Sequence, residues 1–198
     1  MEFAKGVKVP FPDKIKEEYE IRDGSITANI DIDNLDGVVM DFVEMIEEPM
    51  YIGIHVPLEE KEEIKLRKDD TDPFHERVYY LDNCKKDDMR LIIDTFMDVL
   101  INDGLSKFVI ASQVNADEMF IHDYKVASFF GEDIDKMKAL MERFNIPQSE
   151  AIITAMDTFD EEHYGVRSTY ENSDGVNIYD LIDALSSAGM YAGEILEC

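Results

Sequence analysis

The stretch from Asp87 to Phe130 constrains the fold most, because it joins a strongly apolar helix pattern to two apolar strand patterns. Over 89–101, apolar residues recur at the three- and four-residue spacing of an amphipathic helix, and extra apolar positions predict deep burial. Gly104 is expected to end this helix in the left-handed backbone conformation that glycine tolerates. A buried strand over 107–112 and one long strand over 118–130 should follow. A buried helix beside strands indicates the α+β class.

Comparable patterns lie on both sides of this stretch. Alternating apolar and polar residues predict a strand over 25–32 with one face toward solvent, and Asn34 or Asp33 should cap the helix after it. Asn177 is expected to cap a later helix, with Asp180 three residues on as a capping box. The remaining predicted elements are strands over 50–56, 77–81, 151–156, 166–170 and 190–196, a helix over 134–144, and a charged loop over 57–76 that is either mobile or functional.

The order strand–helix–strand–strand–helix–strand therefore occurs twice, and it is the order of a ferredoxin-like βαββαβ unit. We predict an α+β chain with two ferredoxin-like βαββαβ units in tandem, packed as one globule. Residues 1–24 form a lead-in segment, 25–112 the first unit and 117–198 the second. The alternative is one continuous mixed α+β sheet with helices on one face.

The charge balance sets the class of partner. The chain has 45 acidic and 19 basic residues and a net charge of -26. Such a surface repels nucleic acid and anionic membranes, and it attracts basic proteins. The N-terminus lacks the basic start and apolar run of a signal peptide, and no stretch of about 18 apolar residues occurs. We expect a cytoplasmic protein with a basic protein partner and with no nucleic-acid or membrane partner.

Familiar catalytic motifs are missing from the sequence, including G-x-S-x-G, C-x-x-C, H-E-x-x-H and the phosphate-binding G-x-x-x-x-G-K. Asp31, Asp33 and Asp36 have the alternate spacing of calcium ligands, but the sixth and twelfth loop positions hold Asp36 and Phe42 instead of glycine and glutamate. Helix capping is the better interpretation. We predict no metal and no cofactor, and we favour the absence of catalysis.

An acidic loop forms a second cluster, with Asp157, Asp160, Glu161 and Glu162 followed by His163. A histidine among carboxylates can bind a divalent metal or exchange protons. Consecutive side chains in a loop do not converge, however, so a solvated loop is the simpler interpretation. His122 lies among apolar residues of a predicted strand and is interpreted as an interior histidine.

Tyrosines near acidic residues are the one positive functional signal. Aromatic anchors with carboxylates at the rim are typical of a surface that binds a basic protein. The alternative is that half of the rings belong to the core. The tyrosines concerned are Tyr51, Tyr79, Tyr80, Tyr124, Tyr164 and Tyr170. The predicted partner-binding residues are Tyr51, Asp157, Asp160, Glu161, Glu162 and Tyr164.

Two segments resemble a known family. Tyr19-Glu-Ile-Arg-Asp-Gly-Ser25 with the alternating strand after it, and the hairpin pattern over 108–124, are similar to an uncharacterised acidic bacterial α+β domain family. That family is associated with proteins similar to the inhibitor of ribonuclease E, although the closing Tyr-Asp-Gly-Trp of the inhibitor is missing here, since the chain has no Trp. The composition also resembles acidic immunity proteins, which neutralise basic nuclease toxins. The resemblance covers at most 19–144 and carries over no functional residue.

These observations lead to one hypothesis and one rival. The hypothesis is a non-catalytic regulatory module that binds a basic protein, in the manner of an immunity protein or a nuclease inhibitor. The rival is a metal-dependent or novel small-molecule enzyme that uses the acidic loop at 157–163 together with Asp31 or Asp33.

Overall fold

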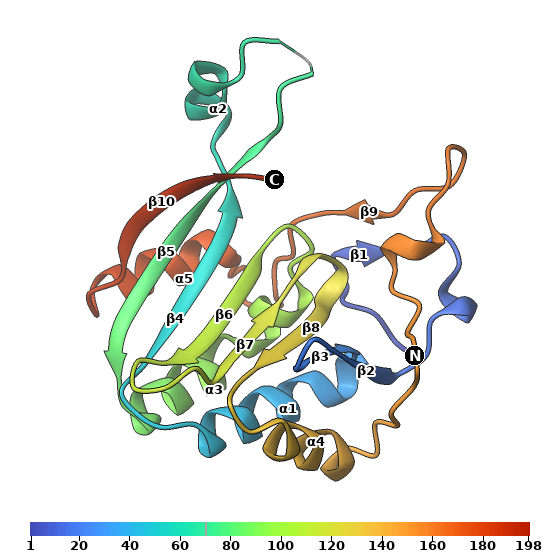
Figure 1. Cartoon of the computed structure of the whole chain (residues 1–198). Helices are drawn as coiled ribbons and strands as arrows, with labels where there is room; N and C mark the ends of the chain where they lie inside the picture. The colour runs from blue at the N-terminus through green and yellow to red at the C-terminus, as the bar shows by residue number, and fades with distance from the viewer. Residues whose placement is uncertain (70) are drawn as a thin grey trace.

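A computed structural model describes residues 1–69 and 71–198 (Figure 1). The strands are β1 (Val7–Lys8), β2 (Glu18–Arg22), β3 (Ser25–Asn29), β4 (Met50–Pro57), β5 (His75–Cys84), β6 (Lys107–Ser112), β7 (Glu118–Ile121), β8 (Val126–Phe130), β9 (Val166–Arg167) and β10 (Tyr191–Glu197). The helices are α1 (Ile32–Met45), α2 (Glu60–Leu66), α3 (Lys86–Asn102), α4 (Ile134–Arg143) and α5 (Ile178–Ser186), with 3-10 turns η1 (Pro12–Lys14), η2 (Asp123–Lys125) and η3 (Met156–Thr158).

Within the described residues, one eight-stranded sheet has the order β10-β5-β4-β6-β7-β8-β3-β2, and every neighbouring pair is antiparallel. β1 and β9 form a separate two-stranded pair. Figure 1 shows α2 beyond the ends of β4 and β5, away from the other helices.

The hydrophobic core lies between one face of the large sheet and the helices α1, α3, α4 and α5. Alternate residues of the central strands, such as Ile54, Phe108 and Phe129, are fully buried and belong to one cluster with the apolar stripes of these helices. Phe42 of α1 meets Phe129 of β8 edge-on, with ring centroids 5.9 Å apart. The period of two in the strands and the spacing of three and four in the helices therefore select the residues that face each other.

The α+β class is confirmed, but two ferredoxin-like units in tandem are not. β3 of the first predicted unit pairs with β8 of the second, β6 pairs with β7, and β5 pairs with β10. Strands from both predicted units thus share one sheet, with helices on one face, as in the alternative prediction. Alternation within a strand sets which face is buried, but it does not select the neighbouring strand.

The predicted strand over 118–130 is broken in the structure. β7 and β8 form a hairpin, and η2 between them contains Tyr124 and Lys125 with φ of 56° and 60°. The turn contains neither glycine nor proline, and Asp123 is its one common turn residue, so the turn signal in the sequence is weak. The pattern of apolar residues over 118–130 consequently predicts one strand where there are two.

Gly104 does follow α3, but not in the left-handed conformation, since its φ is not among the positive values. Its hydrogen in place of a side chain serves close packing instead. A Cβ on Gly104 would collide with the backbone of Gly6, and the Gly104 amide donates to the Ser168 carbonyl at 3.0 Å. This contact joins the β1–β9 pair to the end of α3.

Four further predictions are corrected. The lead-in segment contains β2, which forms one edge of the large sheet, and the predicted loop over 57–76 contains α2 in its described part. Asp31, and not Asn34 or Asp33, caps α1 by accepting a hydrogen bond from the Asp33 amide. The predicted strand over 151–156 is not a strand.

The residues at 151–153 are instead held by polar side chains of the sheet. The Ile152 amide donates to the Glu20 carboxylate at 3.0 Å, and the Asn29 amide nitrogen donates to the Ile153 carbonyl at 2.9 Å. This segment therefore crosses β2 and β3 on the face that does not carry the helices. No helix among the described residues has the length and apolar character to cross a membrane.

Candidate functional site

The face of the large sheet that does not carry the helices, here called the open face, gathers most of the polar and aromatic side chains of the central strands. Strand register defines one row across it: Ser128 pairs with Phe120, Phe120 with Val109, Val109 with Gly53, and Gly53 with Tyr80. Because successive residues of a strand point to opposite faces, residues two positions away lie on the same face. Those include Tyr51, His55, Ala111 and Glu118.

Three tyrosines lie side by side at one end of the open face. The ring centroids of Tyr51 and Tyr80 are 6.0 Å apart, and those of Tyr80 and Tyr191 are 6.1 Å apart. Tyr191 is half exposed, at 50%, whereas the other two are partly buried. β4, β5 and β10 are neighbours in the sheet, so three segments that are distant in sequence form this tyrosine row.

Each tyrosine of the row donates its hydroxyl to a carboxylate. Tyr80 donates to Glu194 at 2.8 Å. Tyr191 donates to Asp82 at 2.7 Å. Tyr51 donates to Glu118 at 3.4 Å. The row is thus a line of aromatic rings whose polar ends meet negative charges.

Two glycines make room for the central ring of the row. A Cβ on Gly53 would lie 3.1 Å from Tyr80 Cε1 and 2.7 Å from Val109 Cγ1. A Cβ on Gly193 would lie 2.7 Å from Tyr80 Cε2. The Tyr80 ring therefore lies over backbone on both sides, in space that any other residue at 53 or 193 would occupy.

The environment keeps these phenols protonated. Burial, followed by the nearby charge of Glu118, raises the pKa of Tyr51 to about 12. Burial and the hydrogen bond to Glu194 raise the pKa of Tyr80, and the hydrogen bond to Asp82 raises the pKa of Tyr191. All three hydroxyls therefore remain protonated donors across the physiological pH range.

A histidine cluster occupies the middle of the open face. His55 Nδ1 lies 2.8 Å from Glu76 Oε1, and Lys107 Nζ lies 2.6 Å from Glu76 Oε2. Phe120 separates the two histidines, with its ring centroid 5.1 Å from His55 and 4.2 Å from His122. The centre of the arrangement is nearly closed to water, since His55 and Glu76 are only 8% and 7% exposed, whereas Lys107, Phe120 and His122 are partly buried.

Opposing effects set the charges of this cluster. Burial disfavours the charge of Glu76, but the hydrogen bonds from His55 and Lys107 outweigh burial and hold the pKa of the Glu76 carboxyl below its usual value. Burial, together with the positive charge of Lys107, lowers the pKa of His122. A neutral His122 has its Nε2 2.9 Å from Ser128 Oγ. The cluster is a satisfied polar network inside the open face.

His122 is therefore close to its predicted environment. It is partly buried, contacts an aromatic ring, and has a hydrogen-bond partner in Ser128. Sequence reasoning did not single out His55 and missed its pairing with Glu76. Their positions 21 residues apart in the chain become neighbours only through the pairing of β4 with β5.

The residues of the acidic loop are placed where most of their side chains meet water. Asp157 accepts from the Thr154 amide and hydroxyl at 2.8 and 2.7 Å, while Asp160 accepts from the His163 amide and lies 2.9 Å from His163 Nδ1. Glu161 and Glu162 are exposed, and Tyr164 is 71% exposed. The loop thus turns two of its carboxylates onto its own backbone.

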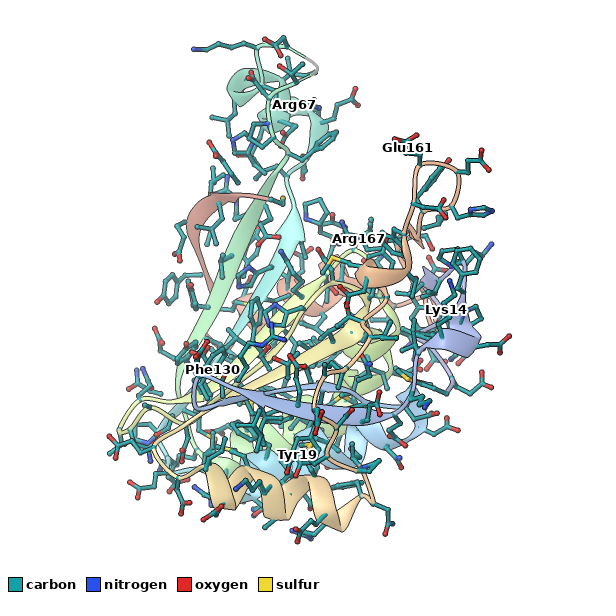
Figure 2. The ribbon with its side chains drawn as sticks, turned by 45° about the vertical axis from the view of Figure 1, so that its right-hand side comes forward. Lys14, Tyr19, Arg67, Phe130, Glu161 and Arg167 are labelled. Atoms are coloured by element: carbon teal, nitrogen blue, oxygen red, sulfur yellow. The ribbon has the colours of Figure 1, made fainter. Side chains whose placement is uncertain are left out.

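The structure does not bring the predicted partner-binding residues together. Tyr51 contacts Glu118, which pairs with Phe130 across β7 and β8. Figure 2 shows Phe130 and Glu161 on opposite sides of the molecule, with Glu161 at the outer end of a projecting loop. Tyr51 and the loop at 160–164 are consequently two separate surfaces.

The remaining predicted tyrosines have structural contacts. Tyr79 packs against the core, Tyr124 meets Phe159 edge-on with ring centroids 5.1 Å apart, and Tyr170 donates to Asp98 at 3.0 Å. Sequence reasoning missed Tyr191, which joins the row only because β10 pairs with β5. The alternation of the predicted strand over 190–196 was the available signal, but it does not name its neighbour.

Among residues 1–69 and 71–198, no group of three or more histidine, cysteine, aspartate or glutamate side chains is arranged to hold a metal ion. Asp31 caps α1 and also accepts from the Glu2 amide at 2.8 Å. Comparison of the chain with protein-family models, with curated proteins and with solved structures finds no match.

Proposed function

We propose that this chain is a non-catalytic binding protein that holds a basic protein partner, and that the tyrosine row on the open face is its main contact. The observation that carries the proposal is the line of three adjacent tyrosine rings, each with its hydroxyl on a carboxylate. A nuclease neutralised by the chain, as in the resemblance to immunity proteins and nuclease inhibitors, is the kind of partner that we propose.

The chemistry of the row suits cationic side chains. A guanidinium or ammonium group is attracted to the face of a tyrosine ring, with a gain of about 0.5–2 kcal/mol depending on desolvation. The carboxylates of Asp82, Glu118 and Glu194 lie at the polar ends of the rings and add a charge-assisted partner for the same cation. Rigid aromatic rings at such a surface lose little side-chain entropy on binding.

The net charge of -26 supports the same proposal at longer range. A strongly negative surface accelerates the encounter with a basic protein at low ionic strength, and salt weakens that effect. In this proposal the predicted loop residues Asp160, Glu161, Glu162 and Tyr164 form a second, outlying contact, and Asp157 fixes the loop through Thr154.

The test begins with affinity capture from bacterial lysate at about 50 mM NaCl, followed by titration calorimetry with the purified partner. We expect a basic protein whose affinity falls when NaCl is raised. Tyr80→Ala should weaken it about tenfold or more, as expected for a central aromatic anchor. Tyr80→Phe should weaken it less, because it keeps the ring and loses only the hydroxyl.

Tyr164→Ala is the matched control for the main contact, since it removes an exposed tyrosine from the other surface. If Tyr164→Ala weakens binding and Tyr80→Ala does not, the acidic loop is the main contact and the row is not. Capture that yields no basic partner at low salt, or a partner indifferent to both substitutions, would contradict the proposal.

A further inference from the structure

A cavity of about 430 Å³ lies where the end of β5, the N-terminal half of α3 and the end of α5 meet. It is on the helix side of the sheet, because Leu81, Ile92 and Leu185, which line it, belong to the core. Its volume falls within the range of small-molecule pockets, which extends from about 300 to 1,000 Å³. The three segments that form it are far apart in sequence, so neither its shape nor its chemistry is visible in any one stretch.

The walls of the cavity are mainly apolar. Ile92, Phe96 and Leu185 line it, and Leu91 lies at its margin with 67% of its surface exposed. An exposed leucine beside an apolar hollow extends the surface on which an apolar molecule gains from leaving water, by about 25 cal/mol for each Å² buried. The cavity thus offers an aromatic or branched aliphatic group a place to bind.

Asp88 gives the cavity a negative charge, and none of the described residues that line the cavity is lysine, arginine or histidine. The Asp88 carboxylate is held in place because it accepts from the Lys85 amide at 3.0 Å. Asp82 also borders the cavity, but its carboxylate lies on the open face, where it accepts from the Tyr191 hydroxyl at 2.7 Å and from Gln113 Nε2 at 3.3 Å. Fixed charges beside apolar walls interact more strongly with a ligand than charges in open water do.

The thiol of Cys84 also lines the cavity, and the charges of Asp88 and Asp82 affect its pKa. The thiol is buried and donates to the Leu81 carbonyl at 3.6 Å. Burial first, and then the negative charges of Asp88 and Asp82, raise the pKa of Cys84 to about 11. The two carboxylates therefore act on the same wall of the cavity.

We propose that this cavity binds a small amphipathic organic amine, with the apolar body against Ile92, Phe96 and Leu185 and the ammonium group toward Asp88. This site is distinct from the tyrosine row, and the proposal does not depend on the proposed function.

The probe is 2-phenylethylammonium chloride, compared with 2-phenylethanol and phenylacetate, which keep the aromatic body and change only the charge. Titration calorimetry should show binding in the order ammonium, alcohol, carboxylate, with the ammonium about threefold to tenfold tighter than the alcohol. Methyl resonances of Leu91, Ile92 and Leu185 should shift on addition of the amine, which locates the site independently of affinity.

Two pairs of variants test separately whether the charge of Asp88 and the open volume of the cavity are needed for binding. Asp88→Asn should weaken the amine about threefold and leave the alcohol unchanged, whereas Asp94→Asn, an exposed residue of α3 outside the cavity, should change neither. Ala188→Phe should fill the cavity and abolish binding of both probes. Ala184→Phe on the exposed side of α5 is its control.

Circular dichroism melting shows whether each variant is folded. If Asp88→Asn or Ala188→Phe does not fold, the unchanged protein still tests the proposal. Its affinities for the three probes and its methyl shifts then show whether the cavity binds the amine. Equal affinity for amine and alcohol, methyl shifts confined to residues outside the cavity, or no binding at millimolar concentration would each overturn the proposal.

Discussion

Glu76 shows how a single buried charge is maintained at the centre of the open face. It accepts from both His55 and Lys107. His55 belongs to β4, which neighbours the strand of Glu76, and Lys107 belongs to β6, one strand further away. A buried carboxylate with one partner removed leaves a charge without compensation, which is far more costly than losing a surface ion pair.

The pKa of the Glu76 carboxyl is lower in the folded protein than in the unfolded chain, where it is about 4.3. The unfolded chain therefore binds the proton first as pH falls. The stability that Glu76 contributes is present above about pH 4.3 and is lost as pH drops through the lower, folded value.

We predict that Glu76→Gln lowers the free energy of unfolding at pH 7 by about 2–4 kcal/mol, because Lys107 is left without its carboxylate. The loss should shrink on acidification below about pH 4, where the parent protein loses the same contribution. Urea unfolding at several pH values measures both effects. Glu47→Gln, at an exposed position, is the control and should change little; an equal loss in both variants would contradict the role given to Glu76.

At the scale of elements, Lys125 connects the β7–β8 hairpin to the end of α3. The residue is buried, has a φ of 60°, and donates from Nζ to the carbonyls of Leu100 at 3.1 Å and Ser106 at 3.0 Å. Leu100 is in the last turn of α3, where carbonyls have no partner within the helix and where a positive charge is favoured. A hairpin without glycine is thus fixed by one long-range side chain.

Burial lowers the pKa of Lys125 to about 8, against about 10.4 in an unfolded chain. Between these values the unfolded chain binds the extra proton, so this residue makes stability rise with pH. We predict that the parent protein gains about 2 kcal/mol more than Lys125→Met between pH 7 and 9.5.

Urea unfolding of both proteins at the two pH values tests this, and the difference between them cancels the titration of other groups. Lys61→Met, which removes an exposed lysine from α2, should follow the pH dependence of the parent protein. If the stability of Lys125→Met also has the pH dependence of the parent protein, the pKa of Lys125 is not lowered in the folded protein, and the proposed link between the hairpin and α3 is wrong.

At the scale of the whole molecule, a net charge of -26 on 198 residues opposes compaction. Like charges repel more in the folded state, where they are closer together, and added salt screens this repulsion over a distance of about 10 Å at 0.1 M. Surface ion pairs such as Arg90–Glu44 and Lys138–Asp135 offset only a small part of it.

We therefore predict that raising NaCl from about 20 to 500 mM increases the free energy of unfolding by an amount on the order of 1 kcal/mol. Thermal melting at both salt concentrations measures the change. The triple variant Glu161→Gln, Glu162→Gln, Asp174→Asn removes three exposed charges and should show a smaller increase. A stability that falls with NaCl would indicate that favourable ion pairs outweigh the repulsion.

The sequence by itself determined the local features of this protein. The apolar stripes of α1, α3, α4 and α5 and the capping box of Asn177 with Asp180 follow from interactions within a few residues. The strands β3, β4, β6 and β10 were also predictable to within a few residues, because alternation reports which side of a strand is buried.

Only the tertiary structure decided which strands are neighbours, and with that the candidate sites. The tyrosine row needs β10 beside β5 and β5 beside β4, and the cavity needs β5, α3 and α5 at one corner. The alternation of apolar and polar residues in a strand is the same whichever strand lies beside it. The contacts of a side chain such as Lys125, which fixes a hairpin by bonding to another element, cannot be recognised in the sequence around it. Pairing is set by the packing of the whole core, which no short stretch of the sequence contains.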